Sequence, residues 1–332
     1  MVKTLLACVF CFFSFYTEAQ TAQVTPAIGV TQPAPQQPPK KMSPRKEPVI
    51  HQFEPNSADY ATDALFISKA GQIGITAQLA YISGYLDFNG TANATFDGFL
   101  SNFTAQYGIE SYLNLYVSQG YTSYTSTTDT NPNFVSTYKG IGDTTLGAKG
   151  SLYLTPGFLI AYDGYYRVGL LAKAETDDSK ANESTSSAVS ERPRVGLSAT
   201  LVALIDKLSI GAFAEGQTYQ EGSYNSIVSS GNRTATQSAG TASSFNIFAQ
   251  YDFGAQVGAS LLLSNQDPYD TTINNTKTHN PGGKSTGVRV YGILPLGQIE
   301  IGAGLTKPNY VGTSVPVTTN LYYTDAFVRA RF

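Results

Sequence analysis

Apolar and polar residues alternate along most of the chain, from about residue 71 to residue 332. The alternation is plainest in the segment 208–215, where every second residue is apolar: Leu208, Ile210, Ala212 and Ala214. Between them stand Ser209, Gly211, Phe213 and Glu215. Because successive side chains of a β-strand point to opposite faces, this period of two residues predicts strands with one apolar face and one mixed face.

The same split recurs in the segments 145–152, 256–263 and 299–306. Their second face carries mostly small or polar residues, namely Thr145, Gly147, Lys149, Ser151, Gln256, Gly258, Ser260, Leu262, Glu300, Gly302, Gly304 and Thr306. A soluble sandwich of two sheets needs more bulk than this on its inner faces. We therefore expect water beside the second face and lipid beside the apolar face, as in a transmembrane β-barrel.

The connections between the segments alternate in length. Short connections lie around 155–157, 205–207, 252–254 and 295–297, and the long ones are rich in Ser, Thr, Asn and Asp and lie near 121–140, 172–192, 221–241, 265–285 and 307–319. Bacterial barrels have short periplasmic turns and long outer loops. The pattern predicts an all-β fold over residues 60–332, an up-and-down antiparallel transmembrane barrel of about 12 strands with both ends in the periplasm.

Residues 1–19 have the organisation of a secretory signal peptide. Lys3 supplies a short positive region, an apolar run follows from Leu5 to Tyr16, and Thr17 and Ala19 are small residues at both positions that determine cleavage. We expect export and cleavage after Ala19. The residues Leu5-Leu6-Ala7-Cys8 also look like a lipoprotein cleavage box, but most of the apolar run follows Cys8. Both cysteines, Cys8 and Cys11, lie in this segment, so the mature protein is expected to carry no thiol or disulfide.

Residues 20–59 differ in composition from the rest of the chain. This segment is rich in Pro and Gln and has few apolar residues, so it cannot bury a core. We expect a flexible periplasmic leader. Lys40, Lys41, Arg45 and Lys46 form a small basic cluster within it, which could touch the cell wall or anionic lipid or could be merely solvated.

The composition excludes several classes of function. The chain has no Trp, 31 Gly and 22 Tyr, and only 14% of its residues are charged, which does not fit a helical enzyme. The formal net charge is −3 and the basic residues of the barrel segment are scattered, so a nucleic-acid partner is not expected. The sequence leaves no room for a nucleotide domain, and we expect neither ATP nor a redox cofactor.

Catalytic and metal-binding candidates are few. The chain has two His, His51 in the leader and His279 in a predicted outer loop. His279 could form a site with Asp267 and Asp270, although a loop His is more often solvated. Acidic pairs such as 177–178 could offer oxygen ligands to calcium but lack the spacing of a calcium loop. We therefore expect no enzyme activity, no cofactor and no metal site.

Charged residues at inward positions of the predicted strands are the most informative candidates, because Arg or Lys facing lipid at the midplane would cost roughly 2–4 kcal/mol. These lumen-lining candidates are Glu110, Lys149, Asp163, Arg167, Arg194, Glu215, Asp252, Arg289, Glu300, Asp325, Arg329 and Arg331. Both signs are present, so a polar lumen of mixed charge is expected. The charges could form paired ladders that brace a narrow barrel, or Arg167, Arg194 and Arg289 could define a charge-selective constriction.

Tyrosine is placed to serve two purposes. Outward residues at the lipid–water boundary are expected at Tyr81, Tyr85, Tyr162, Tyr166 and Tyr251. Inward residues at Tyr153, Tyr165 and Tyr291 could stack with an aromatic or sugar solute.

The last segment carries a resemblance to a known signal. Tyr322, Thr324, Ala326, Val328, Ala330 and Phe332 alternate on one face, and the sequence ends on the aromatic residue. This looks like the C-terminal signal of bacterial outer-membrane barrels. The resemblance implies recognition by the barrel-assembly machinery of Gram-negative bacteria and residence among outer-membrane lipid and lipopolysaccharide.

A second resemblance covers two short glycine-rich motifs. The residues 107–115 (YGIESYLNL) and 140–149 (GIGDTTLGAK) are similar to the phenol meta-degradation family of transporters, which is related in architecture to the long-chain fatty-acid transporters. This resemblance implies passage of hydrophobic compounds and brings no catalytic residues.

Two functions fit these observations. The first is an outer-membrane channel or transporter for passive diffusion of small solutes, including hydrophobic or aromatic ones. The second is a structural or surface-interaction barrel with a closed lumen, whose outer loops bind a partner. Conduction of ions would distinguish the two.

Overall fold

The computed structural model describes residues 67–332 except 88–92, 111, 130–133, 156, 171–172, 175–182, 187–191, 229–230, 274, 281 and 312–316. The expected signal peptide and the leader up to residue 59 lie outside these residues. Within the part of the chain that the structure describes, no helix is long and apolar enough to cross a membrane.

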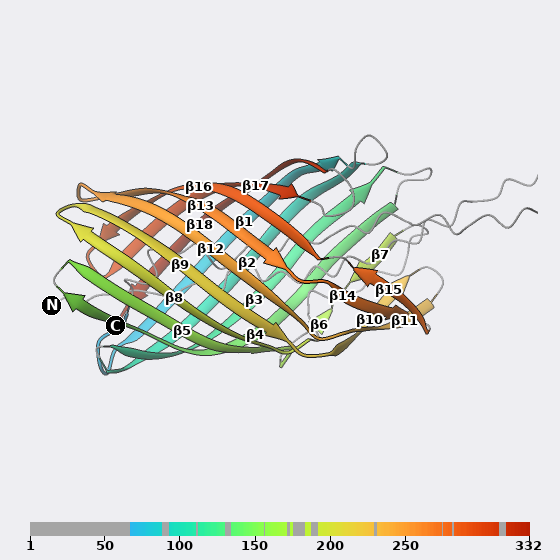
Figure 1. Ribbon diagram of the computed structural model, residues 1–332, viewed down its shortest axis with the longest axis horizontal. Helices are drawn as coiled ribbons and strands as arrows, with labels where there is room; N and C mark the ends of the chain where they lie inside the picture. Colours follow the sequence, from blue (N-terminus) through green and yellow to red (C-terminus); the bar gives the residue numbers. More distant parts are fainter. Residues whose placement is uncertain are drawn as a thin grey trace, which may run out of the picture.

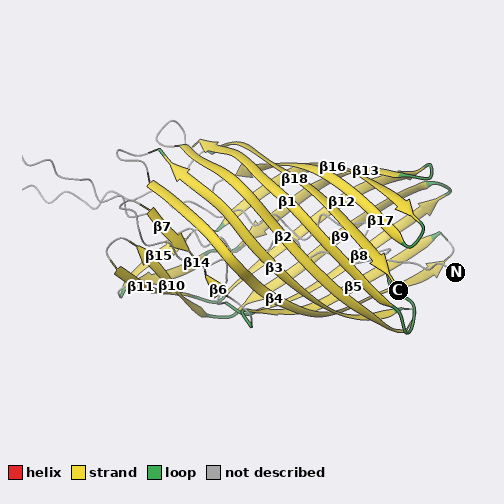
Figure 2. Cartoon of the chain, turned by 180° about the vertical axis from the view of Figure 1, so that it is seen from behind, coloured by secondary structure: helices red, strands yellow, loops and turns green. Residues whose placement is uncertain are grey.

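Twelve long strands form a closed antiparallel barrel, in agreement with the sequence prediction (Figures 1 and 2). In order around the barrel they are β1 (Ile73–Asp87), β2 (Asn93–Glu110), β3 (Leu113–Thr128), β4 (Phe134–Thr155), β5 (Phe158–Val168), β8 (Arg194–Ile205), β9 (Leu208–Tyr219), β12 (Gly240–Asp252), β13 (Gln256–Gln266), β16 (Gly283–Leu296), β17 (Ile299–Val311) and β18 (Thr318–Arg331). Each pairs with the next, and β18 pairs with β1 from Gly74↔Arg331 to Asp87↔Thr318, which closes the ring. Closure leaves no strand edge unpaired in lipid.

Six short strands lie in the outer connections: β6 (Lys173–Ala174), β7 (Glu183–Ser186), β10 (Gly222–Val228), β11 (Gly231–Gln237), β14 (Tyr269–Ile273) and β15 (Thr276–Asn280). Figure 1 shows them at the end of the barrel opposite the C-terminus. The pairs β10–β11 and β14–β15 are hairpins, and β11 pairs with β14, so these two outer connections are largely ordered sheet.

The prediction of a long loop near 121–140 is wrong. β3 continues to Thr128 and β4 begins at Phe134, with pairing up to Thr128↔Phe134. The Ser, Thr and Tyr residues that indicated a solvated loop also have high strand propensity, and once the β3–β4 ladder has formed they extend it beyond the apolar belt.

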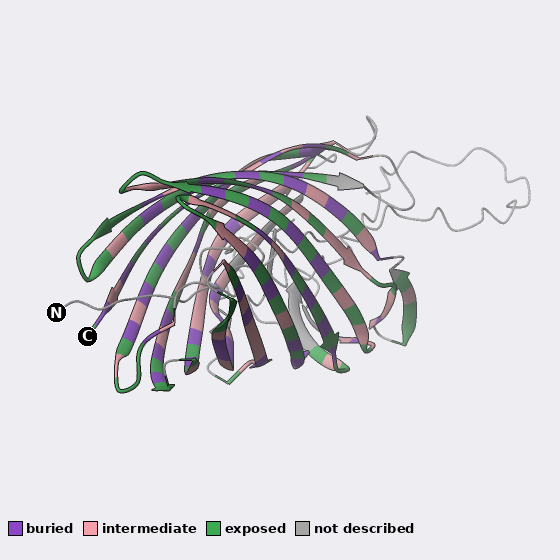
Figure 3. Cartoon of the chain, turned by 60° about the vertical axis from the view of Figure 1, so that its left-hand side comes forward, coloured by how far each residue is buried: buried purple, intermediate pink, exposed green. Residues whose placement is uncertain are grey.

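The outward face of the barrel is apolar, as the alternation predicted. Exposed and buried residues alternate along the strands, which appears as regular banding in Figure 3. Large apolar side chains lie on the exposed face of all twelve barrel strands, and Leu197 on β8 is 68% exposed. Such a surface is stable against lipid and not against water. The five expected boundary tyrosines, Tyr81, Tyr85, Tyr162, Tyr166 and Tyr251, all lie at outward positions.

The C-terminal strand has the predicted orientation. Tyr322, Val328 and Ala330 alternate with buried residues and lie on the lipid side, and the side chain of Phe332 is exposed. The backbone of Phe332 exchanges two hydrogen bonds with Ile73, at 2.9 and 3.1 Å, where β18 meets β1. Recognition of this strand by the assembly machinery stays a prediction.

The small residues of the inward face were expected to lie beside water, and for five glycines this is wrong. An aromatic ring from the neighbouring strand lies directly over each of them, so an added Cβ would come within 2.1–2.4 Å of a ring atom. The five joints are Tyr116 on Gly147, Tyr165 on Gly196, Phe248 on Gly211, Tyr291 on Gly258 and Phe327 on Gly302. The rings thus lie along the barrel wall, and the glycines leave room for them.

The segment just before β1 is held by hydrogen bonds to inward side chains of the barrel wall. Ser68 is 0% exposed: its N–H donates to Asn114 Oδ1 (2.7 Å), Asn114 Nδ2 donates to the Ser68 carbonyl (3.0 Å), and Gln106 Nε2 donates to Ser68 Oγ (2.6 Å). Gly108 allows the approach, because a Cβ there would lie 2.1 Å from the Lys69 carbonyl oxygen. We call residues 68–72 with Asn114 and Gln106 the N-terminal clasp.

Replacing Asn114 by Ala is expected to weaken the clasp, because it leaves a buried N–H and a buried carbonyl of Ser68 without this partner. The expected loss is about 1–3 kcal/mol in the free energy of unfolding, and tryptic cleavage after Lys69, within the clasp, should become faster. Urea unfolding of detergent-refolded protein and limited trypsinolysis measure the two effects. Asn93→Ala is the control, because that side chain is exposed at the start of β2. Equal behaviour of the two variants would contradict the assigned role.

Candidate functional site

The candidate site is the lumen of the barrel, and the structure places most of the predicted charged residues there. Lys149, Arg167, Arg194, Glu215, Arg289, Asp325, Arg329 and Arg331 are inward and buried, and Asp163 and Glu300 are inward and half-buried. Two candidates lie elsewhere. Glu110 is exposed at the end of β2, and Asp252 is exposed at the β12–β13 turn, where its Oδ1 accepts a hydrogen bond from the Gly254 N–H (2.8 Å). The turn position explains both, because strand parity no longer determines direction there.

Two arginines on the β16–β18 side of the lumen are paired with carboxylates. Arg289 Nη2 lies 2.8 Å from Asp325 Oδ2, and the two side chains are 2% and 3% exposed. The guanidinium passes over Gly304 on β17, where a Cβ would lie 2.6 Å from Arg289 Nη2. Arg329 donates to Glu300 Oε2 from Nε (3.0 Å) and Nη2 (2.7 Å). These are two of the ion pairs that ladders bracing the barrel would contain, and Arg289 belongs to one of them. The bracing role stays a prediction.

Three inward tyrosines join strands that are not neighbours. Tyr116 on β3 reaches across β4 and donates to Asp163 on β5 (3.0 and 3.1 Å). Tyr165 on β5 crosses β8 to Glu215 on β9 (2.8 Å), and Tyr291 crosses β13 to Gln250 on β12 (3.2 Å). Each ring lies over a glycine and each hydroxyl reaches the second strand along. Of the residues expected to stack with a solute, Tyr165 and Tyr291 thus hydrogen-bond to other side chains of the barrel wall. Tyr153 is 68% exposed near the β4–β5 turn.

The outer half of the lumen contains three arginines. Arg167 and Arg194 are direct cross-strand partners on β5 and β8. Arg192, which the sequence analysis missed, is also buried. Its Nη1 donates to Gln237 Oε1 (2.9 Å), and its guanidinium lies 5.0 Å from the centre of the Tyr219 ring. Alternation could not have placed it, because Arg192 lies before the first residue of β8 and is separated from it by Pro193.

The lumen is less polar than the sequence predicted. Leu159, Val202 and Phe248 pack together on the inward faces of β5, β8 and β12. Tyr291, Ile293 and Phe327 form a second cluster on β16 and β18. Both clusters include rings that lie over glycines. The inner surface of the barrel therefore carries both apolar clusters and charged groups.

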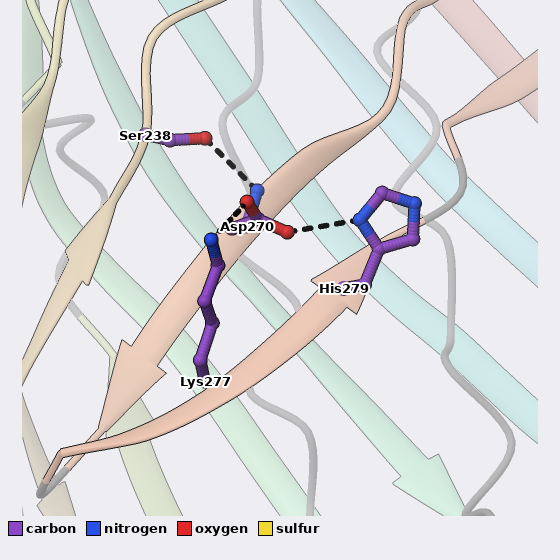
Figure 4. Close-up of polar contacts among 4 residues, drawn as sticks. All are labelled: Ser238, Asp270, Lys277 and His279. Atoms are coloured by element: carbon purple, nitrogen blue, oxygen red, sulfur yellow. Dashed lines mark hydrogen bonds and ion pairs between the residues drawn. The ribbon is translucent and has the colours of Figure 1, made fainter.

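The histidine candidate lies in the outer β14–β15 hairpin (Figure 4). His279 Nδ1 and Lys277 Nζ lie 2.9 and 2.8 Å from the two carboxylate oxygens of Asp270. Asp267 is not part of this group and instead accepts hydrogen bonds from Thr241 and Asn265. The described residues contain no group of three or more His, Cys, Asp or Glu that could hold a metal ion, and the acidic pair 177–178 lies outside them. The contacts fit a cross-strand brace of an exposed hairpin.

The brace is expected to respond to acid. Lys277 and, secondarily, His279 lower the pKa of Asp270 below its ordinary value of 3.8. A carboxyl with a lowered pKa stabilises the folded hairpin above the ordinary pKa, and this contribution is lost as the pH falls through the folded value. We expect the protection of the β14–β15 amides against exchange, measured relative to the intrinsic rate at each pH, to be unaffected by the titration of Asp270 near neutrality and to fall in the range below 3.8. Lys277→Gln should shift the Asp270 titration, followed by carboxyl NMR, upward, and an unshifted titration would contradict the role of Lys277.

The fold has known relatives, although the sequence alone does not reveal them: no protein-family model and no curated protein matches the chain. An outer-membrane channel from Pseudomonas putida F1 superposes with a TM-score of 0.58 at 14% identity, covering 80% of this chain and 97% of that one. The translocator domain of the autotransporter NalP from Neisseria meningitidis gives 0.43 at 10% identity, over 80% and 90% of the two chains. A mutant of the monoaromatic hydrocarbon channel TodX gives 0.43 at 8% identity, over 84% and 94%.

The likeness to the Pseudomonas channel and the apolar outer face agree with the barrel predicted from the sequence. The resemblance to the phenol meta-degradation family stays a prediction. The chain has the fold of bacterial outer-membrane β-barrel proteins.

Proposed function

We propose that this protein is a passive outer-membrane channel for small solutes, without catalytic activity of its own. One observation carries the proposal: a closed barrel with an apolar outer face places buried charged and polar side chains from all twelve barrel strands on a common inner surface. Lining of this kind lowers the barrier for solutes that leave bulk water. A transporter that uses ATP would need a domain for which the barrel has no counterpart in the described residues.

The chemistry of the lining indicates the class of solute. Inward side chains are almost all buried, and we infer that the solutes are small. The apolar clusters around Phe248 and Tyr291 offer contact to hydrophobic or aromatic groups. The Pseudomonas protein of similar fold is described as a channel, which supports the general kind of function.

Conductance tests the proposal. Mature protein refolded in detergent and inserted in a planar bilayer should give discrete open steps, with heat-modifiable migration on a gel as the control for folding. Silence of a correctly folded sample, together with no uptake in a liposome-swelling assay with small sugars or benzyl alcohol, would overturn it.

The rival function is supported by one specific feature. The hairpins β10–β11 and β14–β15 form an ordered sheet in the outer connections, which could bind a partner at the cell surface. Replacing both hairpins by short Gly-Ser connections should leave conductance intact if the protein is a channel. Loss of adhesion to a cell or phage, with a wild-type barrel that never conducts, would favour the surface-interaction function.

A further inference from the structure

The outward faces of β16 and β17 end in lysine at the outer edge of the apolar belt. On β17 the outward residues from Ile299 to Leu305 are all apolar, and the next outward residue is Lys307. On β16 the apolar run is followed on the same face by Thr286 and Lys284. Both lysines are exposed. An outward lysine is costly at the midplane of a bilayer and inexpensive near its surface, so both positions fit the level of the lipid headgroups.

The length of the strands places both lysines at that level. A barrel strand tilted by about 40° rises about 2.5 Å per residue along the barrel axis, so it crosses an apolar band about 25 Å tall in about ten residues. Counted from the short β16–β17 turn, that length reaches Pro308 on β17 and Gly287 on β16. Lys307 therefore lies at the boundary of the band and Lys284 just beyond it. Long connections mark the outer side of such barrels, so this boundary belongs to the outer leaflet.

Neutral hydrogen-bond donors lie between the two lysines. Thr286 on β16 and Asn309 on β17 are direct cross-strand partners on the outward face. Lys284 is the next outward residue above this pair on β16, and Lys307 is the next one below it on β17. The offset of four residues corresponds to about 13 Å along the strands, and neighbouring strands lie about 4.8 Å apart, so the two lysine backbones are about 14 Å apart. We call Lys284, Thr286, Lys307 and Asn309 the basic patch.

The ring of Tyr322 orients one of the lysines. Lys307 Nζ lies 5.3 Å from the centre of this ring, which belongs to an outward residue of β18. An ammonium group is attracted by the face of a tyrosine ring, and the aliphatic part of a lysine covers apolar surface while its charged end stays in a polar layer. The contact therefore keeps the charge of Lys307 within the basic patch.

The sequence of β16–β18 provides no acidic side chain for the outward face. The acidic residues of the segment 283–331 are Glu300 and Asp325, and both point inward, each in an ion pair with an arginine. Beyond β18 the sign of the outward charge changes. Residues 70–138 contain no Lys or Arg, and Asp97 is exposed on the outward face of β2, where it accepts a hydrogen bond from Tyr81. The positive charge of the basic patch is therefore local to this side of the barrel.

Two ammonium groups with neutral donors between them suit a lipid headgroup that carries more than one phosphate. Basic side chains at a membrane surface attract anionic lipids, lysine binds phosphate as a point charge, and the hydroxyl of Thr and the amide of Asn donate to phosphate oxygens. The phosphorylated glycolipid of the outer leaflet is lipopolysaccharide.

We propose that the basic patch binds the phosphate groups of lipopolysaccharide in the outer leaflet, with Lys284 and Lys307 as the charged contacts. The proposal goes beyond the channel function and does not rest on it, because the patch lies on the outside of the barrel. The two are tested separately.

Binding is measured by native mass spectrometry of detergent-refolded mature protein titrated with bisphosphorylated lipid A. Wild type should form a saturable complex. Lys307→Gln and Lys284→Gln should each weaken it about fivefold and the double variant about 25-fold, as expected for one and two lysines beside an anionic surface. Lys307→Arg, which keeps the charge, should bind like wild type. The matched control is Lys207→Gln, which removes the same charge from the exposed β8–β9 turn at the other end of the barrel and should also bind like wild type.

The chemistry of the ligand is tested with the same protein. Lipid A without its phosphates should bind about tenfold more weakly or less, and potassium phosphate should displace lipid A no better than potassium chloride at equal ionic strength. Equal binding by the double variant and Lys207→Gln, equal binding of the dephosphorylated lipid, or specific displacement by inorganic phosphate would overturn the proposal. A lipid-free dimer of wild type that is lost in the double variant would also overturn it, since the patch would then hold a second copy.

Conduction is measured in parallel. The double variant should keep the single-channel conductance of wild type, because both lysines point away from the lumen, and heat-modifiable migration reports folding. A wild type that binds lipid A through the two lysines but never conducts refutes the channel and leaves the basic patch standing. A wild type that conducts but forms no saturable complex with lipid A refutes the basic patch alone.

Discussion

Asp325→Leu is expected to lower the free energy of unfolding by about 3–5 kcal/mol, because it leaves the Arg289 guanidinium buried without its carboxylate. The two groups are 2.8 Å apart, and both side chains are almost completely buried. Asp325→Asn, which keeps the size of the side chain and removes its charge, should destabilise in the same direction, which separates the unpaired charge from the larger volume of Leu. Equilibrium unfolding in urea of protein refolded into detergent micelles measures the effect.

The double variant Arg289→Met/Asp325→Leu is the control. Replacing both members of a buried pair by apolar residues removes the unpaired charge, so most of the lost stability should return. Glu300→Leu should also destabilise, because its partner Arg329 is 2% exposed, but the cost should be smaller, since the Glu300 side chain is itself 22% exposed and water already reaches its side of the pair. If the double variant were as unstable as Asp325→Leu alone, the lost stability would not come from the unpaired arginine.

Gly211→Ala is expected to destabilise the barrel by about 1–3 kcal/mol or more, through overpacking of the joint with Phe248. An added Cβ would lie 2.3 Å from Phe248 Cζ and 2.7 Å from the Leu201 carbonyl oxygen. The ring could turn aside, but the backbone oxygen of the neighbouring strand cannot. The same urea unfolding experiment measures the change, and heat-modifiable migration shows whether the barrel still closes.

Gly216→Ala on the same strand is the matched control. Nothing lies within 4 Å of a Cβ at Gly216, which is exposed on the outward face. Replacing glycine at a compatible position reduces the freedom of the unfolded chain, so this variant should be unchanged or more stable by about 0.4–1 kcal/mol. Opposite signs for the two substitutions would establish the joint, whereas a shared destabilisation would point to a general cost of removing glycine from β9.

The sequence predicted the fold well because lipid on one face of each strand imposes an alternation of apolar and polar residues that is visible in the sequence. Alternation in segments such as 208–215 reports which face meets lipid, and the alternating connection lengths report the end of the barrel to which each turn belongs. Parity also placed Arg167, Arg194 and Arg289 on the inner wall. Parity fails where strands end, as at Glu110 and Asp252, and at the irregularity of the β3–β4 ladder, where Thr144 and Thr145 are both buried.

The arrangement of the site could not be predicted in the same way. The partner of Arg289 is Asp325, which lies 36 residues later in the sequence. Their contact depends on the register of the strands, and alternation does not fix register. The glycines at 147, 211, 258 and 302 were expected to lie beside water. The sequence does not show that an aromatic ring of the neighbouring strand covers each of them. The polar residues near 121–140 indicated a loop. Ser and Thr are equally common in exposed strands, so composition alone could not distinguish the two.

The five ring-on-glycine joints lie within strand pairs that are connected at the outer end of the barrel: β3–β4, β5–β8, β9–β12, β13–β16 and β17–β18. The connection is long in β5–β8, β9–β12 and β13–β16. In the remaining pair of this kind, β1–β2, Gln106 covers Gly74 in the same manner. A tight turn sets the alignment of its two strands by itself, but a long connection does not. A slip of one residue would turn the ring out toward lipid.

Alignment within β5–β8, β9–β12 and β13–β16, whose connections are long, is therefore specified in the wall and not in the connection. Lengthening a flexible connection is inexpensive, about 0.6 kcal/mol for each doubling. The outer connections are consequently free to diverge in length and sequence among descendants of this barrel, and to accept inserted epitopes, while the wall that they join stays in register.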